Sequence, residues 1–284
     1  MEYGERIMSK YKIISDSSSD IKDISDVAFS SVPLKISTAE KEFCDDKSLD
    51  LNEMLTYLEK YKGRSGSACP NTSEWLEAFE NYENIFCIAI TSSLSGSYNS
   101  AVSAAKEYTE MHKDRNVLVI DSLSTGPECA LIIEKLKELI TAGKAFDEIS
   151  KEITEYRKHT HLLFALESMH NLANNGRVSP IVAKLAGVLG IRIVGKASDV
   201  GTLEIINKSR GAKKMLEDIV DNMKKMECSG KVFIHHCENE STAKKIEELV
   251  KENFINTTVK ISPVGGLCGF YAERGGILIG FEGE

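Results

Sequence analysis

An apolar segment, residues 86–90, runs without a break into a hydroxyl-rich segment, residues 91–97, and this junction constrains the fold more than any other part of the chain. The first segment has the composition of a buried β-strand, and an Ala-rich helical pattern follows the second. A strand that leads directly into a helix predicts an α/β fold.

The same junction predicts a binding site for an anion. A helix N-terminus leaves backbone N–H groups unpaired and carries a partial positive charge. Because residues 91–97 contain no Lys or Arg, the site favours a single carboxylate over a chain of phosphates. The alternative is that the serines only cap the helix, which is their commoner use.

Strands and helices alternate through the first half of the chain. Strand patterns are found at residues 11–14, 31–36, 86–90 and 116–120, and helical patterns at residues 51–61, from residue 95, and at residues 123–141 and 146–159. Asn71, with Glu74 three positions later, predicts the capped start of a further helix. This order favours a parallel sheet that is covered by helices.

The second half begins with a predicted strand at residues 161–166 and a short helix at residues 167–173, which ends at an Asn-Asn-Gly sequence typical of a helix C-terminus. A hairpin is predicted from residues 191–194 and 202–206, and alternating helices and strands lead to a Gly-rich segment and a last strand at residues 277–281. We therefore expect an N-terminal parallel-sheet α/β domain over residues 1–160. A C-terminal mixed α/β domain is expected over residues 161–284.

Size and charge exclude several classes of function. A chain of 284 residues is long enough for two lobes that share a cleft. Its net charge of −8 opposes binding to nucleic acid. No apolar run approaches the length of a membrane span, and the charged N-terminal segment lacks the apolar region of a signal peptide, so we expect a cytoplasmic protein without stable membrane insertion. The seven cysteines show no Cys-x-x-Cys spacing, which favours reduced thiols.

Several short motifs, taken in order, resemble the DegV family. They stand at residues 16–20, 33–34, 45–46, 67–71, 92–96, 121–122, 171–179, 201–203 and 208–211. The resemblance runs from about residue 12 to residue 281. It implies a two-domain α/β protein that holds one long-chain fatty acid between its lobes, with the carboxylate bound by hydroxyl side chains. It also implies that a separate kinase subunit phosphorylates the bound fatty acid to an acyl phosphate, so that this chain is a carrier without catalytic residues or a cofactor.

The resemblance also assigns the candidate site residues. The family's Thr-Ser-Gln-Pro-Ser loop stands here as residues 67–71, so its leading hydroxyl is Ser67. The Ser-Ser-x-x-Ser-Gly element stands here as residues 91–96, which assigns the second carboxylate ligand to Ser92, beside Thr91. Arg177 matches a Gly-Arg-Ile-Ser element near the mouth of the site. The alternatives are a turn hydroxyl at Ser67 and a solvated loop charge at Arg177.

The chain departs from the family pattern near its C-terminus. Where the family has Gly-x-His-x-Gly-Pro-Gly, Tyr271 occupies the His position and Arg274 the Pro position. A neutral phenol can donate a hydrogen bond to a carboxylate, but it cannot become a cation as His can. We therefore expect binding of the fatty acid to persist, while phosphate transfer by a kinase lacks the charge or the proton that a histidine could supply. Arg274 either restores a positive charge at the site or belongs to the surface.

The energetics of binding favour a lipid over a small polar acid. About fourteen buried methylenes contribute about 11 kcal/mol, against an association cost of about 4–15 kcal/mol. Hydrogen bonds to an ionised carboxylate, at about 1.5–3 kcal/mol each, would supply the net binding free energy that burial of the tail alone barely provides. Apolar residues 181–183, 185–189 and 191–194 are candidates for the tunnel lining, although they could equally belong to the core.

Other functions have weaker support in the sequence. A serine lipid hydrolase would need a nucleophile elbow, and no Gly-x-Ser-x-Gly sequence is present. A metal site could be formed by His235, His236 and Cys237, but no further ligands stand at a usual spacing from them. Cys268 lies among glycines without a basic neighbour, so a packed thiol is favoured over a reactive one. A carrier of another acidic lipid, not coupled to a kinase, is the main alternative.

Overall fold

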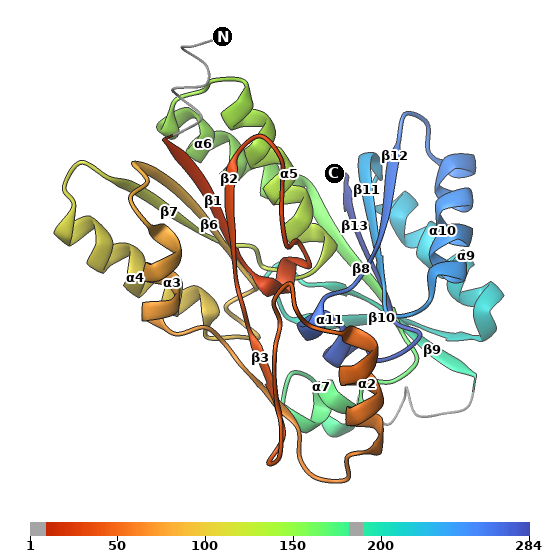
Figure 1. Cartoon of the computed structure of the whole chain (residues 1–284). Helices are drawn as coiled ribbons and strands as arrows, with labels where there is room; N and C mark the ends of the chain where they lie inside the picture. The colour runs from red at the N-terminus through yellow and green to blue at the C-terminus, as the bar shows by residue number, and fades with distance from the viewer. Residues whose placement is uncertain (1–9, 182–189) are drawn as a thin grey trace.

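The protein is described here by a computed structural model that covers residues 10–181 and 190–284. Its first sheet has four strands in the order β2-β1-β6-β7, and every neighbouring pair is parallel (Figure 1). These strands are β1 (Tyr11–Asp16), β2 (Ala28–Val32), β6 (Asn84–Ala89) and β7 (Asn116–Asp121). The strands predicted at residues 11–14, 86–90 and 116–120 are thus confirmed, and so is the parallel sheet of the N-terminal lobe.

Helices cover both faces of this sheet, as the alternation of elements predicts. One face carries α3 (Thr72–Phe79) and α4 (Ser97–Met111), and the other carries α5 (Pro127–Thr141) and α6 (Phe146–Tyr156), followed by the short η2 (Arg157–His159). Helix α3 begins with the predicted capping box: Glu74 N–H donates to Asn71 Oδ1 at 3.0 Å, and Asn71 N–H donates to Glu74 Oε2 at 2.8 Å. Trp75 and Phe79 are thereby held on the buried face of the helix.

The second sheet has six strands in the order β10-β9-β8-β13-β11-β12. They are β8 (Thr160–Leu166), β9 (Ile191–Ala197), β10 (Leu203–Arg210), β11 (Ser229–His236), β12 (Thr258–Pro263) and β13 (Ile277–Glu282). Only the β11–β12 pair is parallel, so the sheet is mixed, as expected for the C-terminal lobe. The predicted hairpin is confirmed as β9 and β10.

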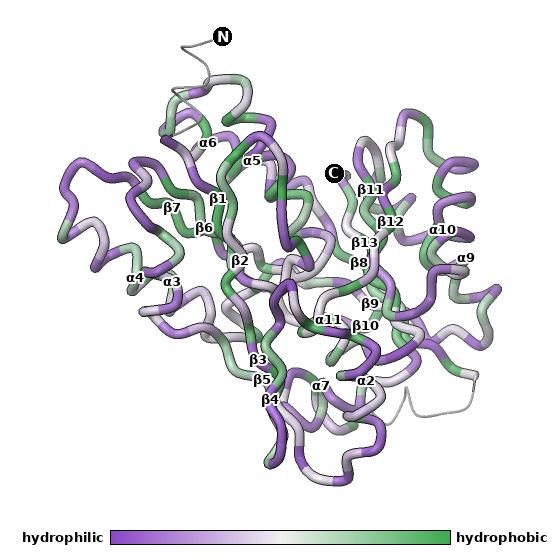
Figure 2. The backbone as a smooth tube through the Cα atoms, in the orientation of Figure 1, coloured by the Kyte–Doolittle hydropathy of each residue, from purple (hydrophilic) through white to green (hydrophobic). Residues whose placement is uncertain are grey.

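Helices α9 (Gly211–Lys225) and α10 (Glu240–Asn253) pack on one face of the six-stranded sheet. The opposite face is turned toward the N-terminal lobe, where α5 contacts β13, β11 and β8. Gly280 permits this contact, since a side chain there would collide with the backbone of Pro127. Figure 2 shows hydrophobic stretches along strands β6 and β7 of the first sheet, whereas much of the outer helix α10 is hydrophilic.

A small antiparallel sheet, β4-β3-β5, was not predicted and lies below the two larger ones (Figure 1). It is formed by β3 (Lys35–Ser37), β4 (Glu42–Cys44) and β5 (Gly66–Ala68). Helices α2 (Leu51–Lys60), α7 (His170–Asn174) and α11 (Gly266–Ala272) gather near it. This region joins segments from both halves of the chain, because α11 contacts β3 and α2. The division of domains near residue 160 stays a prediction.

Two of the predicted boundaries differ from the structure. The strand expected at residues 31–36 is divided between β2 and β3, because Pro33 has no N–H to donate and Leu34 N–H donates instead to Ser17 Oγ in the short η1 (Ser17–Ser19). The helix expected at residues 123–141 begins only at Pro127, since Leu123 and Gly126 adopt positive φ angles. Helix α11 was missed because its glycines read as a loop.

Candidate functional site

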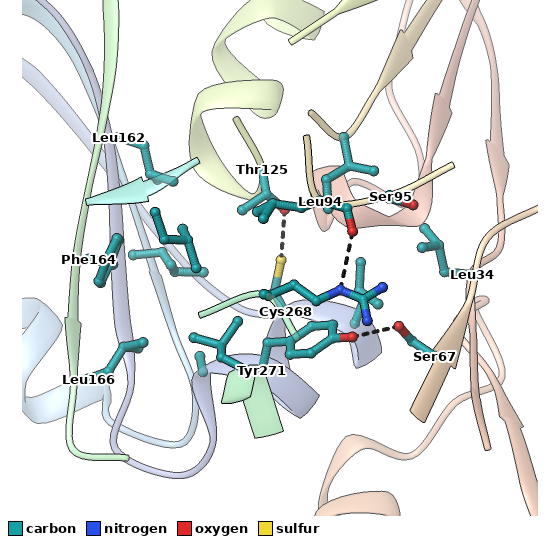
Figure 3. A pocket seen from close by; sticks show the side chains of 17 residues that line it. Leu34, Ser67, Leu94, Ser95, Thr125, Leu162, Phe164, Leu166, Cys268 and Tyr271 are labelled. Carbon is teal, nitrogen blue, oxygen red and sulfur yellow. Dashed lines mark hydrogen bonds between the residues drawn. The ribbon is translucent and has the colours of Figure 1, made fainter. Parts of the chain in front are cut away.

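An apolar pocket with about 660 Å³ of atom-free space, its open mouth included, lies between the two larger sheets. Strand β8 forms one wall through Leu162, Phe164 and Leu166, which occupy alternate positions and so share a face. Figure 3 shows these three side chains along one side of the pocket, with Leu34 and Ser67 on the opposite side. A cavity with such walls suits a hydrocarbon chain.

Two hydroxyl groups meet at the polar end of this pocket. Ser67 Oγ in β5 and Tyr271 Oη in α11 lie 2.7 Å apart (Figure 3). Burial raises the pKa of the Tyr271 phenol, although its hydrogen bond to Ser67 and the charge of Arg177 act in the opposite direction. The phenol therefore stays protonated at neutral pH. Because only one hydroxyl can donate to the other, the accepting hydroxyl keeps its own proton available for a ligand.

Arg177 brings positive charge to the same end. Its guanidinium carbon lies 5.6 Å from the centre of the Tyr271 ring. Its Nε donates to the carbonyl of Leu94 at 3.2 Å, and its Nη1 donates to the carbonyl of Asn175 at 2.6 Å. Arg177 also lines the pocket, and its place at the mouth of a fatty-acid site stays a prediction. These contacts fix the guanidinium where it can offset the charge of a bound carboxylate.

The loop before α4 contributes a serine other than the one predicted. Helix α4 begins at Ser97, with Gly96 as its N-cap residue, and Ser95 lines the pocket. Ser97 N–H donates to Ser95 Oγ at 3.3 Å, so the Ser95 hydroxyl can still donate its own proton. Ser95 is thus a candidate ligand that the alignment of motifs did not single out.

Ser92 and Thr91, the predicted carboxylate ligands of this loop, do not line the pocket among the described residues. Ser92 is exposed, and its N–H donates to Asp121 Oδ1 at 3.1 Å on the side of β7. Thr91 is buried, and its Oγ1 accepts from Ser93 N–H at 3.2 Å. The physical reason is the late start of α4, which leaves residues 91–96 as a loop that turns Ser95, rather than Ser92, toward the cavity.

Asp16 holds this loop in place from the end of β1. The carboxylate is fully buried and its Oδ2 accepts from Ile90 N–H at 3.0 Å and from Ser97 Oγ at 2.6 Å. Its Oδ1 accepts from Ser18 Oγ at 2.5 Å. Burial raises the pKa of Asp16, opposed by these hydrogen bonds. Since Ile90 and Ser97 bracket residues 91–96, Asp16 fixes both ends of the loop.

Two more buried carboxylates position α11, which carries Tyr271. Asp45 accepts from the N–H groups of Gly266 at 2.8 Å and Leu267 at 2.9 Å. Asp20 accepts from Gly265 N–H at 2.7 Å and lies 2.7 Å from His235 Nδ1. No role was predicted for these two aspartates, although both stand in motifs of the family resemblance. Carboxylates at a helix N-terminus pair its free N–H groups and favour its dipole.

Arg274 lies in a surface network rather than at the site. Its Nε contacts Glu59 Oε1 at 2.7 Å, and its Nη2 donates to Asn52 and Thr56 of α2, each at 2.9 Å. A further ion pair joins it to Glu238. Of the two roles considered for Arg274, the structure therefore supports the surface one. The charge that a histidine could provide is not replaced by this residue.

The Cys268 thiol has structural contacts. Cys268 lines the pocket, and its buried thiol donates to the carbonyl of Ser18 at 3.3 Å. Burial raises the pKa of this thiol well above its ordinary value, which agrees with a packed rather than a reactive cysteine. Within residues 10–181 and 190–284, no group of His, Cys, Asp and Glu side chains could hold a metal ion.

Only part of the predicted tunnel lining falls within the described residues. Residues 182–189 lie outside the described residues, and Ile181 is exposed. Ile193 is buried in the core, but residues 191–194 do not line the described pocket. The described apolar wall comes instead mainly from β8, together with Leu203, Leu172 and Leu278. Strand β8 was predicted as an element, but a single strand pattern does not show which face borders a cavity.

Comparison with known proteins agrees with this architecture. A family model described as "Uncharacterised protein, DegV family" matches residues 10–283. A DegV domain-containing protein of Streptococcus pneumoniae is 43% identical over 277 residues, which cover 96% of this chain and 99% of that protein. In the part of the chain that the structure describes, no helix is both long enough and apolar enough to cross a membrane.

Two solved structures are similar over almost their whole length. One is a DegV family protein from Eubacterium eligens loaded with heptadecanoic acid, with a TM-score of 0.94 and 47% identity, covering 96% of this chain and all of that one. The other is the Streptococcus pneumoniae Fatty Acid Kinase (Fak) B3 protein loaded with linoleic acid, with a TM-score of 0.95 and 42% identity, covering 97% of this chain and 100% of that chain. Both similar proteins hold a fatty acid.

Proposed function

This chain belongs to the DegV family, and from that premise we propose that it binds a long-chain fatty acid in the pocket between its lobes and presents the carboxyl group to a fatty-acid kinase subunit. The observation that carries the proposal is the Ser67–Tyr271 hydroxyl pair at the polar end of an otherwise apolar pocket. The fatty acids held by the two similar structures support the choice of ligand.

The carboxylate accepts two hydrogen bonds from hydroxyl groups in this proposal. The Ser67–Tyr271 pair donates one hydrogen bond, and Ser95 donates a second. Ser95 takes the role that the motif pattern assigned to Ser92 and Thr91. Arg177 contributes through its charge, which is held beside Tyr271 by bonds to two backbone carbonyls. Hydrogen bonds to an ionised group are worth about 1.5–3 kcal/mol each, so together they fix the orientation of the fatty acid, with its carboxylate at the polar end of the pocket.

The acyl chain lies along β8. Leu162, Phe164 and Leu166 supply apolar surface on one side, and removal of each methylene from water contributes about 0.8 kcal/mol. The tail therefore provides most of the affinity, while the hydroxyl groups provide orientation. This division suits a carrier, because the reacting group is held by a few hydrogen bonds that a second protein can replace.

The coupling to a kinase rests on the similar Fatty Acid Kinase (Fak) B3 protein. In this proposal the chain supplies the substrate and the partner supplies the phosphate and the catalytic groups, in the cytoplasm. Tyr271 is the residue that most affects this step, because a phenol cannot become a cation. Binding and presentation are therefore separate properties that separate measurements can test.

Mass spectrometry of lipid extracted from the purified protein tests the binding proposal. We expect straight-chain fatty acids in the wild type and much less in a Ser67→Ala/Tyr271→Phe variant. A Thr109→Ala variant, altered on α4 away from the pocket, is the control and should retain its lipid. Recovery of no fatty acid together with esterase turnover would contradict the proposal, and recovery of a different acidic lipid would change the ligand class. A kinase subunit with ATP should convert the bound fatty acid to an acyl phosphate.

A further inference from the structure

A second pocket of different chemistry lies next to the apolar one. Among the described residues it is lined by Glu128 of α5, Arg157 and Thr160 near the start of β8, and Asp199 of the β9–β10 turn. Glu128 is buried, and its Oε1 accepts from Thr160 Oγ1 at 2.8 Å. Cavities lined by such groups hold water. Neither the sequence motifs nor the proposed fatty-acid site gives this polar pocket a role.

Leu162 borders both pockets. It lines the apolar pocket together with Phe164 and Leu166, and it lines the polar pocket together with Thr160. Its side chain is only 1% exposed. The polar pocket therefore begins where the apolar wall of β8 ends.

Two neighbouring segments also border both pockets, each with one residue in the lining of the polar pocket and one in the lining of the apolar pocket. In the loop between β7 and α5, Leu123 lines the polar pocket and Thr125 lines the apolar one. In the β9–β10 hairpin, Ala197 borders the polar pocket and its cross-strand partner Leu203 borders the apolar one. Directly opposed residues of an antiparallel pair share a face of the sheet. A single row of side chains, with Leu162 in it, thus separates the two compartments.

The boundary between the two pockets lies away from the polar end of the apolar pocket. In Figure 3, Leu162 stands at the upper end of the β8 wall, on the side opposite to Ser67. Leu166 stands at the other end of the same wall, four residues along the strand or roughly 13 Å away. An acyl chain that starts at the Ser67–Tyr271 pair and crosses to β8 reaches the polar pocket only past Leu162.

We propose that Leu162 is a specificity-determining residue that ends the acyl-chain pocket and limits the length of the fatty acid. This proposal rests on the proposed function. A methylene buried along β8 gains about fourfold in affinity. A methylene pushed past Leu162 instead displaces water from Glu128 and Thr160 and leaves their polar atoms facing hydrocarbon, which reverses the gain. A polar group at the far end of the chain does not suffer this penalty, because it can replace the displaced water.

Chain-length profiles of Leu162→Ala and Leu166→Ala test the proposal. The two variants lose the same atoms from the same strand and the same pocket wall, but only Leu162 borders the polar pocket. Dissociation constants are measured for palmitic, stearic, arachidic and behenic acids and for their ω-hydroxy derivatives. For Leu162→Ala we expect the optimum to move to a longer acid, and at that length the ω-hydroxy derivative to bind about fivefold more tightly than its parent acid.

For Leu166→Ala we expect no preference for the ω-hydroxy derivatives. Equal profiles for the two variants, or an unchanged optimum in Leu162→Ala, would overturn the proposal. Failure of the proposed function gives a different result, since the wild type would then bind none of the plain acids. Thermal unfolding reports whether each variant is folded, and if Leu162→Ala is not, Leu162→Val should show the same shift to a smaller extent.

Discussion

The hydroxyl groups of Ser67 and Tyr271 lie 2.7 Å apart, although 204 positions separate the two residues in the chain. Ser67 belongs to the small antiparallel sheet of the N-terminal half, and Tyr271 belongs to α11 near the C-terminus. The contact therefore joins the two halves of the chain at the polar end of the pocket. It also depends on a phenol at a position where the family resemblance places histidine.

Replacement of that phenol by histidine should accelerate transfer of phosphate to the bound fatty acid. A Tyr271→His variant can carry positive charge next to the carboxylate while the phosphate arrives, and Tyr271 cannot. The initial rate of acyl-phosphate formation, with a fatty-acid kinase subunit and ATP, measures the effect. Tyr271→Phe is the control: it should weaken fatty-acid binding by about 1 kcal/mol and bring no gain in rate. An equal rate for the histidine variant and the wild type would mean that the phenol is sufficient.

Ser95 and Ser92 should differ in their effect on binding, although three positions separate them. Ser95→Ala removes a donor from the pocket and should weaken fatty-acid binding about tenfold, or roughly 1.5 kcal/mol. Ser92→Ala changes an exposed hydroxyl outside the pocket and should leave the dissociation constant within twofold. Titration of a fluorescent fatty acid into each variant gives both constants. A loss in Ser92→Ala without one in Ser95→Ala would place the carboxylate on the outer side of the loop.

The sequence identified a loop that borders the pocket, but not which serine of that loop lines it. A strand followed by hydroxyl residues and a helix is a local pattern, and it correctly predicted β6, the loop and α4. Which hydroxyl faces the pocket depends on a distant residue, because Asp16 in β1 holds Ile90 and Ser97 at the two ends of the loop. No local pattern reports such a contact.

The same reasoning applies to Arg177 and Arg274. Arg177 follows Gly176, whose positive φ of 74° ends α7 where the Asn-Asn-Gly sequence predicted, so its place near the pocket could be foreseen. Arg274 follows α11, a helix that was missed because of its glycines, and three of its partners lie on α2, more than two hundred residues earlier. The parallel sheet and the hairpin were predictable from short-range patterns, whereas the small sheet β4-β3-β5 was not, because its strands have three residues each.

The buried carboxyl group of Glu128 should make folding stability depend on pH. Burial raises its pKa from 4.5 to about 7, in spite of the hydrogen bond from Thr160 and the charge of Arg157. Between these two pH values the folded protein binds the proton and the unfolded chain releases it, so the free energy of unfolding falls as the pH rises. A shift of this size corresponds to roughly 3 kcal/mol.

Urea denaturation of the wild type and of Glu128→Gln at several pH values between 4.5 and 8 measures this dependence. Glutamine cannot ionise, so the wild type should lose stability relative to Glu128→Gln across the interval, by roughly 3 kcal/mol in total. The difference between the two proteins removes the contributions of other groups, such as Asp16, whose pKa is also raised by burial. Glu110→Gln, an exposed position on α4, controls for the loss of a surface charge. A constant difference across the interval would contradict the raised pKa.

Removal of the Asp45 carboxylate should loosen α11 and, through it, the polar end of the pocket. Asp45 is fully buried and pairs the N–H groups of Gly266 and Leu267, while Lys22 Nζ contacts it at 2.6 Å. Asp45→Ala leaves these donors without their acceptor, so we expect the free energy of unfolding to fall by roughly 2–3 kcal/mol. Chemical denaturation with and without bound fatty acid measures the loss.

The neighbouring carboxylate provides a matched control for this prediction. Asp46 accepts from Ser48 N–H and Oγ in a surface turn, so Asp46→Ala should cost less than half as much. Because α11 carries Tyr271, Asp45→Ala should also weaken fatty-acid binding, whereas Asp46→Ala should not. Equal losses of stability in the two variants would show that the α11 N-terminus does not depend on Asp45. Unchanged fatty-acid binding in Asp45→Ala would show instead that Tyr271 is held by its packing beside Phe270 and Arg177.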